Sequence, residues 1–212
     1  EFCVMKYFKR SIFFGFIIAF FVISQPEARE FNSAFMPITG KARPPVGHVK
    51  FCDSNPEECE IQDNQDGLVT LTQERWDELI RINHLVNQSV TAVTDMELYA
   101  RPEVWAFPGK YGDCEDFALL KRHFLMQAGW PAGSLLITVA LDIDGGGHAV
   151  LTVKTDRGDF ILDNLEALVK NWAETPYTYL KRQSSKHPAK WETVDNARHV
   201  APTLTSSTKY RS

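Results

Sequence analysis

Three residues in the second half of the chain could together support nucleophilic catalysis: Cys114, His148 and Asp163. Cys114 stands in Gly-Asp-Cys-Glu-Asp, directly before a helical pattern, so we expect its thiol at a helix N-terminus. The positive end of the helix dipole there favours a thiolate, and free backbone amides can stabilise an oxyanion. For an isolated cysteine the alternative is a buried, inert thiol.

His148 and Asp163 are expected on neighbouring strands. His148 follows three glycines and opens the apolar run 149–153, and Asp163 ends the run 159–163. If these runs pair as a hairpin, the carboxylate can lie beside the imidazole and orient it. Taken alone, His148 could equally be a structural histidine. Together with Cys114, the set predicts acyl transfer through a thioester.

Three carboxylates flank the cysteine: Asp113, Glu115 and Asp116. Their negative charge opposes formation of a thiolate, so the site needs a counter-charge from an imidazolium or a bound cation. The alternative is a solvated helix start, where carboxylates interact favourably with the dipole.

The periodicity of the apolar residues predicts an α+β fold with N-terminal helices packed on an antiparallel sheet. Apolar residues three and four apart predict a helix over 76–90, capped by Thr70 or Thr72, and a second helix that begins near Cys114 and stops at Gly129. The period then changes to that of strands, with Gly-containing hairpin turns between them, over 135–141, 148–153 and 159–163. Helices followed by strands are typical of the α+β class.

The remaining cysteines differ in their surroundings. Cys52 and Cys59 flank a turn containing Asn55-Pro56, and in an exported protein such a pair predicts a disulfide. A metal site is the alternative, but no second Cys or His pair with zinc spacing accompanies it. Cys3 falls in a segment expected to be removed, which leaves Cys114 as the unpaired thiol.

The N-terminus resembles a signal peptide. Basic residues from Lys6 to Arg10 precede an uncharged run, Ile12 to Ile23, which is shorter than the roughly 20 residues that span a bilayer. We therefore expect a signal peptide over 1–28, export and no permanent membrane anchor; a retained anchor is the alternative. The peptidase domain is predicted over 29–195 and begins with an extended arm. A Thr- and Ser-rich tail is predicted over 196–212.

The charge of the chain argues against nucleic acid as a partner. The formal net charge is −4, and nucleic-acid surfaces need clustered Lys and Arg. The basic residues around Lys181–Arg182 and Lys186–Lys190 are expected to be solvated.

Three segments carry a resemblance to a known family: Gly112-Asp-Cys-Glu-Asp, Gly147-His-Ala-Val-Leu and Leu162-Asp-Asn. Their order and spacing resemble the bacterial transglutaminase-like cysteine proteinase family, over roughly residues 45–195. The resemblance implies a papain-like fold, a periplasmic location and a catalytic triad of Cys114, His148 and Asp163.

The best-known members of that family clip a large surface adhesin and use calcium held by acidic residues beside the nucleophile. The resemblance thus implies Asp113, Glu115 and Asp116 as calcium ligands, although no further acidic ligand stands at Lys110 or Tyr111. The acyl-transfer chemistry itself requires no cofactor.

We therefore expect an exported cysteine peptidase that hydrolyses a peptide bond in a cell-envelope or surface protein. A transglutaminase or amidase with the same triad is one alternative, and a non-catalytic binding domain is another. Trp105 and Trp172 could flank a peptide groove, or they could belong to the core.

Overall fold

The computed structural model describes residues 34–62 and 68–195, which all belong to one compact unit. The predicted signal peptide over 1–28, Cys3 and the tail over 196–212 lie outside the described residues, so they stay predictions, as do the domain boundaries. Among the described helices, none is long and apolar enough to cross a membrane.

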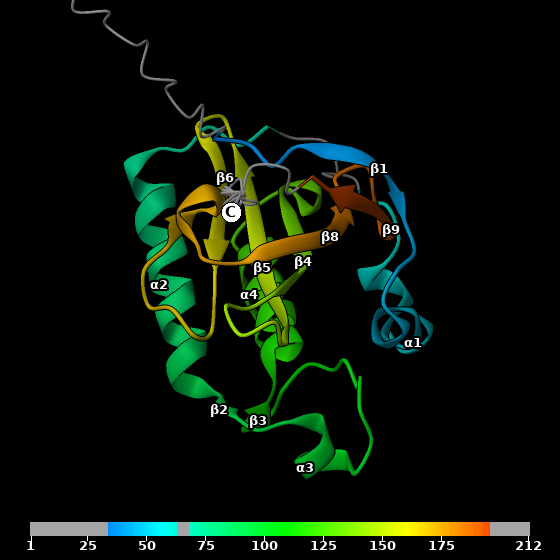
Figure 1. Cartoon of the computed structure of the whole chain (residues 1–212). Coiled ribbons are helices and arrows are strands. Elements are labelled where there is room, and N and C mark those ends of the chain that lie inside the picture. Colours follow the sequence, from blue (N-terminus) through cyan, green and yellow to red (C-terminus); the bar gives the residue numbers. More distant parts are fainter. Residues whose placement is uncertain (1–33, 63–67, 196–212) are drawn as a thin grey trace, which may run out of the picture. The chain divides into compact units, whose positions relative to one another are not determined.

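A seven-stranded antiparallel sheet forms the centre of the fold, in the order β1-β9-β8-β4-β5-β6-β7 (Figure 1). This confirms the predicted sheet, and the paired strands β5 and β6 confirm the predicted hairpin. The strands are β1 (Ile38–Ala42), β4 (Leu135–Leu141), β5 (Gly147–Thr155), β6 (Gly158–Leu162), β7 (Lys170–Asn171), β8 (Thr178–Ser184) and β9 (His187–Val194). Two short strands, β2 (Thr91–Ala92) and β3 (Tyr111–Gly112), pair in parallel apart from it.

The two predicted helices are present, and the structure adds two shorter ones. They are α1 (Val46–Ser54), α2 (Gln73–Ser89), α3 (Asp95–Tyr99) and α4 (Cys114–Gln127). The Thr72 side chain caps α2 by accepting a hydrogen bond from the backbone N–H of Arg75. After α4 the chain turns at Gly129, whose φ of +85° suits glycine. Figure 1 shows α4 running behind β4 and β5, with α2 beside it.

The core lies on both faces of the sheet because side chains alternate along each strand. Leu135, Ile137 and Leu151 join the core cluster that includes the buried faces of α2 and α4. Val150 and Ile161 join a second cluster with aromatic residues of the 3₁₀ turn η3 (Trp172–Glu174) and of β8. Each fully buried aliphatic side chain contributes roughly 1.5–3 kcal/mol.

The extended arm predicted at the start of the domain contains β1, an edge strand paired with β9. Two other expectations were wrong. Arg182, expected in solvent, is buried and bonds at 2.7 Å to Oδ2 of the buried Asp159, which lies on β6, two strands beyond β4, the neighbour of β8. Trp172 is only 1% exposed, because η3 packs its indole into the second core cluster, so it flanks no groove.

Candidate active site

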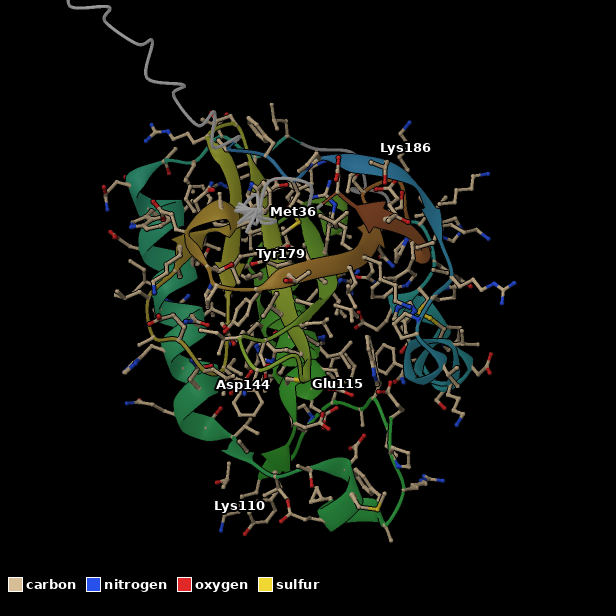
Figure 2. The ribbon with its side chains drawn as sticks, in the orientation of Figure 1. Met36, Lys110, Glu115, Asp144, Tyr179 and Lys186 are labelled. Atoms are coloured by element: carbon tan, nitrogen blue, oxygen red, sulfur yellow. A yellow bond between two sulfur atoms is a disulfide. The ribbon has the colours of Figure 1, made fainter. Side chains whose placement is uncertain are left out.

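A cleft of about 700 Å³ opens at the end of the sheet where α4 and β5 begin. Cys114 reaches it from the first position of α4, and His148 reaches it from the second residue of β5. Trp105 lies in its wall, but it is only 7% exposed and belongs to the core cluster that includes α2 and α4, so both alternatives predicted for it apply. Figure 2 shows Glu115 at this end of the central strands. The cleft is therefore lined by both Cys114 and His148, from different elements of the fold.

His148 and Asp163 are in direct contact, as the hairpin predicted. The β5–β6 register pairs Leu151 with Leu162, so Asp163 follows directly after the strand and its Oδ1 lies 2.9 Å from His148 Nε2. Both residues are buried. Since Nε2 faces Asp163, the other ring nitrogen, Nδ1, is the one left for a proton exchange with Cys114.

The environment of Asp163 keeps it ionised. Burial alone would raise its pKa, but the hydrogen bond and charge of His148 and the hydroxyl of Tyr177 hold the pKa below its ordinary value. The backbone N–H of Leu165 donates a further bond to Oδ1 at 3.0 Å. An ionised carboxylate here can orient the imidazole and stabilise its charged form.

Cys114 is held as a thiol, because burial and the acidic neighbours noted in the sequence outweigh the effect of the helix start. Its Sγ donates to Glu115 Oε2 at 3.0 Å. Burial, followed by the charge of Glu115, raises the pKa of the Cys114 thiol, and only the backbone N–H of Ala149 acts in the opposite direction. The helix dipole contributes about 0.3–1 kcal/mol, too little to outweigh a buried acidic neighbour.

Three aspartates gather beside the nucleophile: Asp95, Asp113 and Asp116 offer carboxylate oxygens within 4.8 Å of one another. Burial and the charge of Glu115 raise the pKa of Asp113 to about 8, and burial raises that of Asp116 to about 7. Asp113 Oδ1 and Asp116 Oδ2 are buried without a hydrogen-bond partner. Clustered carboxylate oxygens with unfilled bonding capacity suit a hard cation such as calcium.

The sequence did not identify Asp95 as part of this group. The parallel pairing of β2 with β3 brings the start of α3 beside the start of α4, although the two segments are separated along the chain. The sequence feature that could have pointed to Asp95 is a local one, the Thr94-to-Glu97 capping-box pattern, which places Asp95 in the first turn of α3. The third acidic residue of the cluster thus comes from an earlier element and not from Lys110 or Tyr111.

Glu115 occupies a different position from the other predicted calcium ligands. Its carboxylate accepts the hydrogen bond of Cys114, and burial raises its pKa. The structure therefore brings Asp113 and Asp116 together with Asp95, and it turns Glu115 towards the nucleophile.

The disulfide between Cys52 and Cys59 is confirmed, and it supports the helix that carries the nucleophile. Glu58, inside the bridged segment, bonds to Arg122 of α4 at 2.7 Å. The Nε of Arg122 in turn donates to Leu135 O. The bridged segment thus ties α4 to the sheet.

Comparisons with known proteins identify the family of the chain. The family model described as bacterial transglutaminase-like cysteine proteinase matches residues 38–199. Among solved structures, calcium-bound Legionella pneumophila LapG is similar at 27% identity, with 57% of this chain and 70% of that chain covered and a TM-score of 0.45. EGTA-treated LapG is also similar at 27% identity, covering 58% and 69%, with a TM-score of 0.46. A comparison with curated proteins gave no match. On the family match, the chain belongs to the bacterial transglutaminase-like cysteine proteinases and is a cysteine peptidase of the transglutaminase-like type.

Proposed function

We propose that this peptidase is exported to the periplasm and hydrolyses a peptide bond in a cell-envelope or surface protein through Cys114, His148 and Asp163. The observation that carries the proposal is the buried His148–Asp163 pair, which lies at a cleft that Cys114 also lines. Basic residues ahead of a short apolar run at the N-terminus support export.

The geometry supports a two-step acyl transfer. His148 Nδ1 accepts the proton of Cys114 as the sulfur attacks the substrate carbonyl carbon, and the carbonyl electrons move to oxygen. Backbone amides at the start of α4 stabilise that oxyanion. The imidazolium then donates its proton to the leaving amine, which departs as the thioester forms. Water, deprotonated by His148, hydrolyses the thioester and restores the thiol. Asp163 stays ionised throughout and keeps Nε2 protonated.

The same site is proposed to hold calcium through Asp95, Asp113 and Asp116. The two unpartnered buried oxygens fit a cation that bonds to carboxylates. A bound calcium ion would supply positive charge beside the acidic residues that now disfavour the Cys114 thiolate. The residues of the chain alone perform the proton transfers.

The experiment compares the purified protein with Cys114→Ala, each incubated with an extract of cell-surface proteins, with calcium or with EGTA. New N-termini are mapped by mass spectrometry. Cleavage by the wild type alone, and only with calcium, is expected. New N-termini in the Cys114→Ala sample, or none in either sample, would contradict the proposal, and amine incorporation without cleavage would indicate a transglutaminase.

A further inference from the structure

We infer that Tyr177 is a positioning residue of this site, one that fixes Asp163 and through it the proton-bearing nitrogen of His148; the inference rests on the proposed function. Tyr177 directly precedes β8 and is 8% exposed. Its hydroxyl donates a hydrogen bond to Asp163 Oδ2. Its ring lies 5.1 Å from the His148 ring, at 58° to it. One side chain therefore contacts both partners of the pair.

The hydroxyl of Tyr177 completes the bonding of Asp163. Oδ1 is shared by His148 Nε2 and the backbone N–H of Leu165, whereas Oδ2 takes the Tyr177 hydroxyl. Asp163 lies just beyond the end of β6, where Asn87 Nδ2 holds its backbone carbonyl, and its side chain is held by the bonds to its two carboxylate oxygens. With a donor on each oxygen the carboxylate cannot turn about its own axis without breaking a buried hydrogen bond.

A fixed carboxylate determines the tautomer of the imidazole. While Oδ1 holds the proton on His148 Nε2, Nδ1 is left unprotonated and can accept the proton of Cys114. If Asp163 turned, Nδ1–H and Nε2–H imidazoles would both be populated, and the Nδ1–H form cannot act as a base towards the thiol. Tyr177 acts through Asp163 and His148, and the proposed mechanism assigns it no contact with the reacting atoms.

The ring of Tyr177 is itself held in place. It packs edge-on against Tyr179 at 6.2 Å, within the second core cluster that also contains Trp172. The ring that lies against His148 is therefore itself held by core packing, and it limits the movement of the imidazole towards Tyr177.

The chain supplies a matched control. Tyr179, labelled in Figure 2, is fully buried on β8 and its hydroxyl lies 2.7 Å from Thr175 Oγ1. Tyr177→Phe and Tyr179→Phe each remove one buried hydroxyl and keep the ring, but only the first removes the donor to Asp163. Circular dichroism and thermal melting of both variants report whether each is folded.

The first readout is the ¹⁵N spectrum of protein labelled at histidine, which reports the tautomer of His148 without any substrate. In the wild type and in Tyr179→Phe we expect a single Nε2–H form. In Tyr177→Phe we expect a mixture of tautomers. An unchanged His148 signal in folded Tyr177→Phe would overturn the inference, whether or not the protein is a peptidase.

The second readout is the rate of alkylation of Cys114 by iodoacetamide at fixed pH and calcium, in the wild type, Tyr177→Phe, Asp163→Asn and the double variant. Removing a hydrogen bond to a charged group predicts about a tenfold lower rate in Tyr177→Phe. Because Tyr177 acts through Asp163, the same change in the Asp163→Asn background should have less than a twofold effect. Equal effects in both backgrounds would overturn the positioning role. A third outcome separates the two proposals: no variant changes the alkylation rate of Cys114, but Tyr177→Phe does shift the tautomer of His148. That result would contradict the activation of Cys114 by His148 and would support the positioning role of Tyr177.

Discussion

Calcium binding at the aspartate cluster should release protons and should therefore depend steeply on pH. In the absence of the ion, the pKa of Asp113 is about 8 and that of Asp116 about 7, chiefly because both are buried. At pH 7 Asp113 is thus mostly protonated and Asp116 is about half protonated. Calcium binds the ionised forms, so its binding at pH 7 should release about one and a half protons.

The size of the pH dependence of calcium affinity follows from the same two pKa values. At a pH below both pKa values, Asp113 and Asp116 must each lose a proton before they can bind the ion. At a pH above both values, the two carboxyls are already ionised. From pH 6 to pH 9 the affinity for calcium should therefore rise about a thousandfold, with most of the change complete near pH 8.

Isothermal titration calorimetry with calcium, in two buffers that differ in ionisation enthalpy, measures both the number of protons released and the calcium affinity. Asp116→Asn removes one of the titrating groups, so its proton release at pH 7 should fall to about one while its affinity weakens. A calcium affinity that is constant between pH 6 and pH 9, or heats that are the same in both buffers, would refute the reasoning.

Three further perturbations test parts of the fold. Burial lowers the pKa of Lys121 to about 7, so between pH 7 and 10.5 the unfolded chain binds a proton at Lys121 that the folded chain lacks, and the destabilisation due to Lys121 shrinks as pH rises. In urea unfolding at pH 7, Lys121→Met should therefore be more stable than the wild type by at most about 5 kcal/mol. The difference should be gone near pH 10.5. Burial, and then the charge of Arg122, lowers the pKa of His48 to about 4, so the unfolded chain binds a proton at His48 that the folded chain does not take up between pH 6.5 and pH 4. Over this range the wild type should therefore lose about 3 kcal/mol of stability relative to His48→Gln, measured by urea unfolding of both proteins at each pH. Reduction of the Cys52–Cys59 disulfide should lower the free energy of unfolding by about 2–3 kcal/mol, and an unchanged urea midpoint would contradict a stabilising bridge.

The sequence predicted the parts of the fold whose signals are local. The helix that begins at Cys114, the β5–β6 hairpin and the disulfide each depend on neighbouring residues, so periodicity and turn residues sufficed. The contact of His148 with Asp163 followed from that hairpin alone.

The sequence missed the features that depend on distant partners. Arg182 of strand β8 looks solvated until the fold brings the buried carboxylate of Asp159, on β6, within hydrogen-bond distance of it. Asp95 reaches the cluster only through the β2–β3 pairing. The opposition of the acidic neighbours to a Cys114 thiolate was visible in the sequence, but the largest effect on the Cys114 pKa is burial, which a position at a helix start does not reveal.

The central claim is that His148, held by Asp163, activates Cys114, and alkylation tests it without a known substrate. Purified wild type, His148→Ala and Asp163→Asn are treated with iodoacetamide at pH 7 in calcium, and the peptide that contains Cys114 is quantified by mass spectrometry over time. We predict that both variants react at least about tenfold more slowly than the wild type, and that EGTA slows the wild type as well. Equal rates for all three folded proteins in calcium would contradict the account.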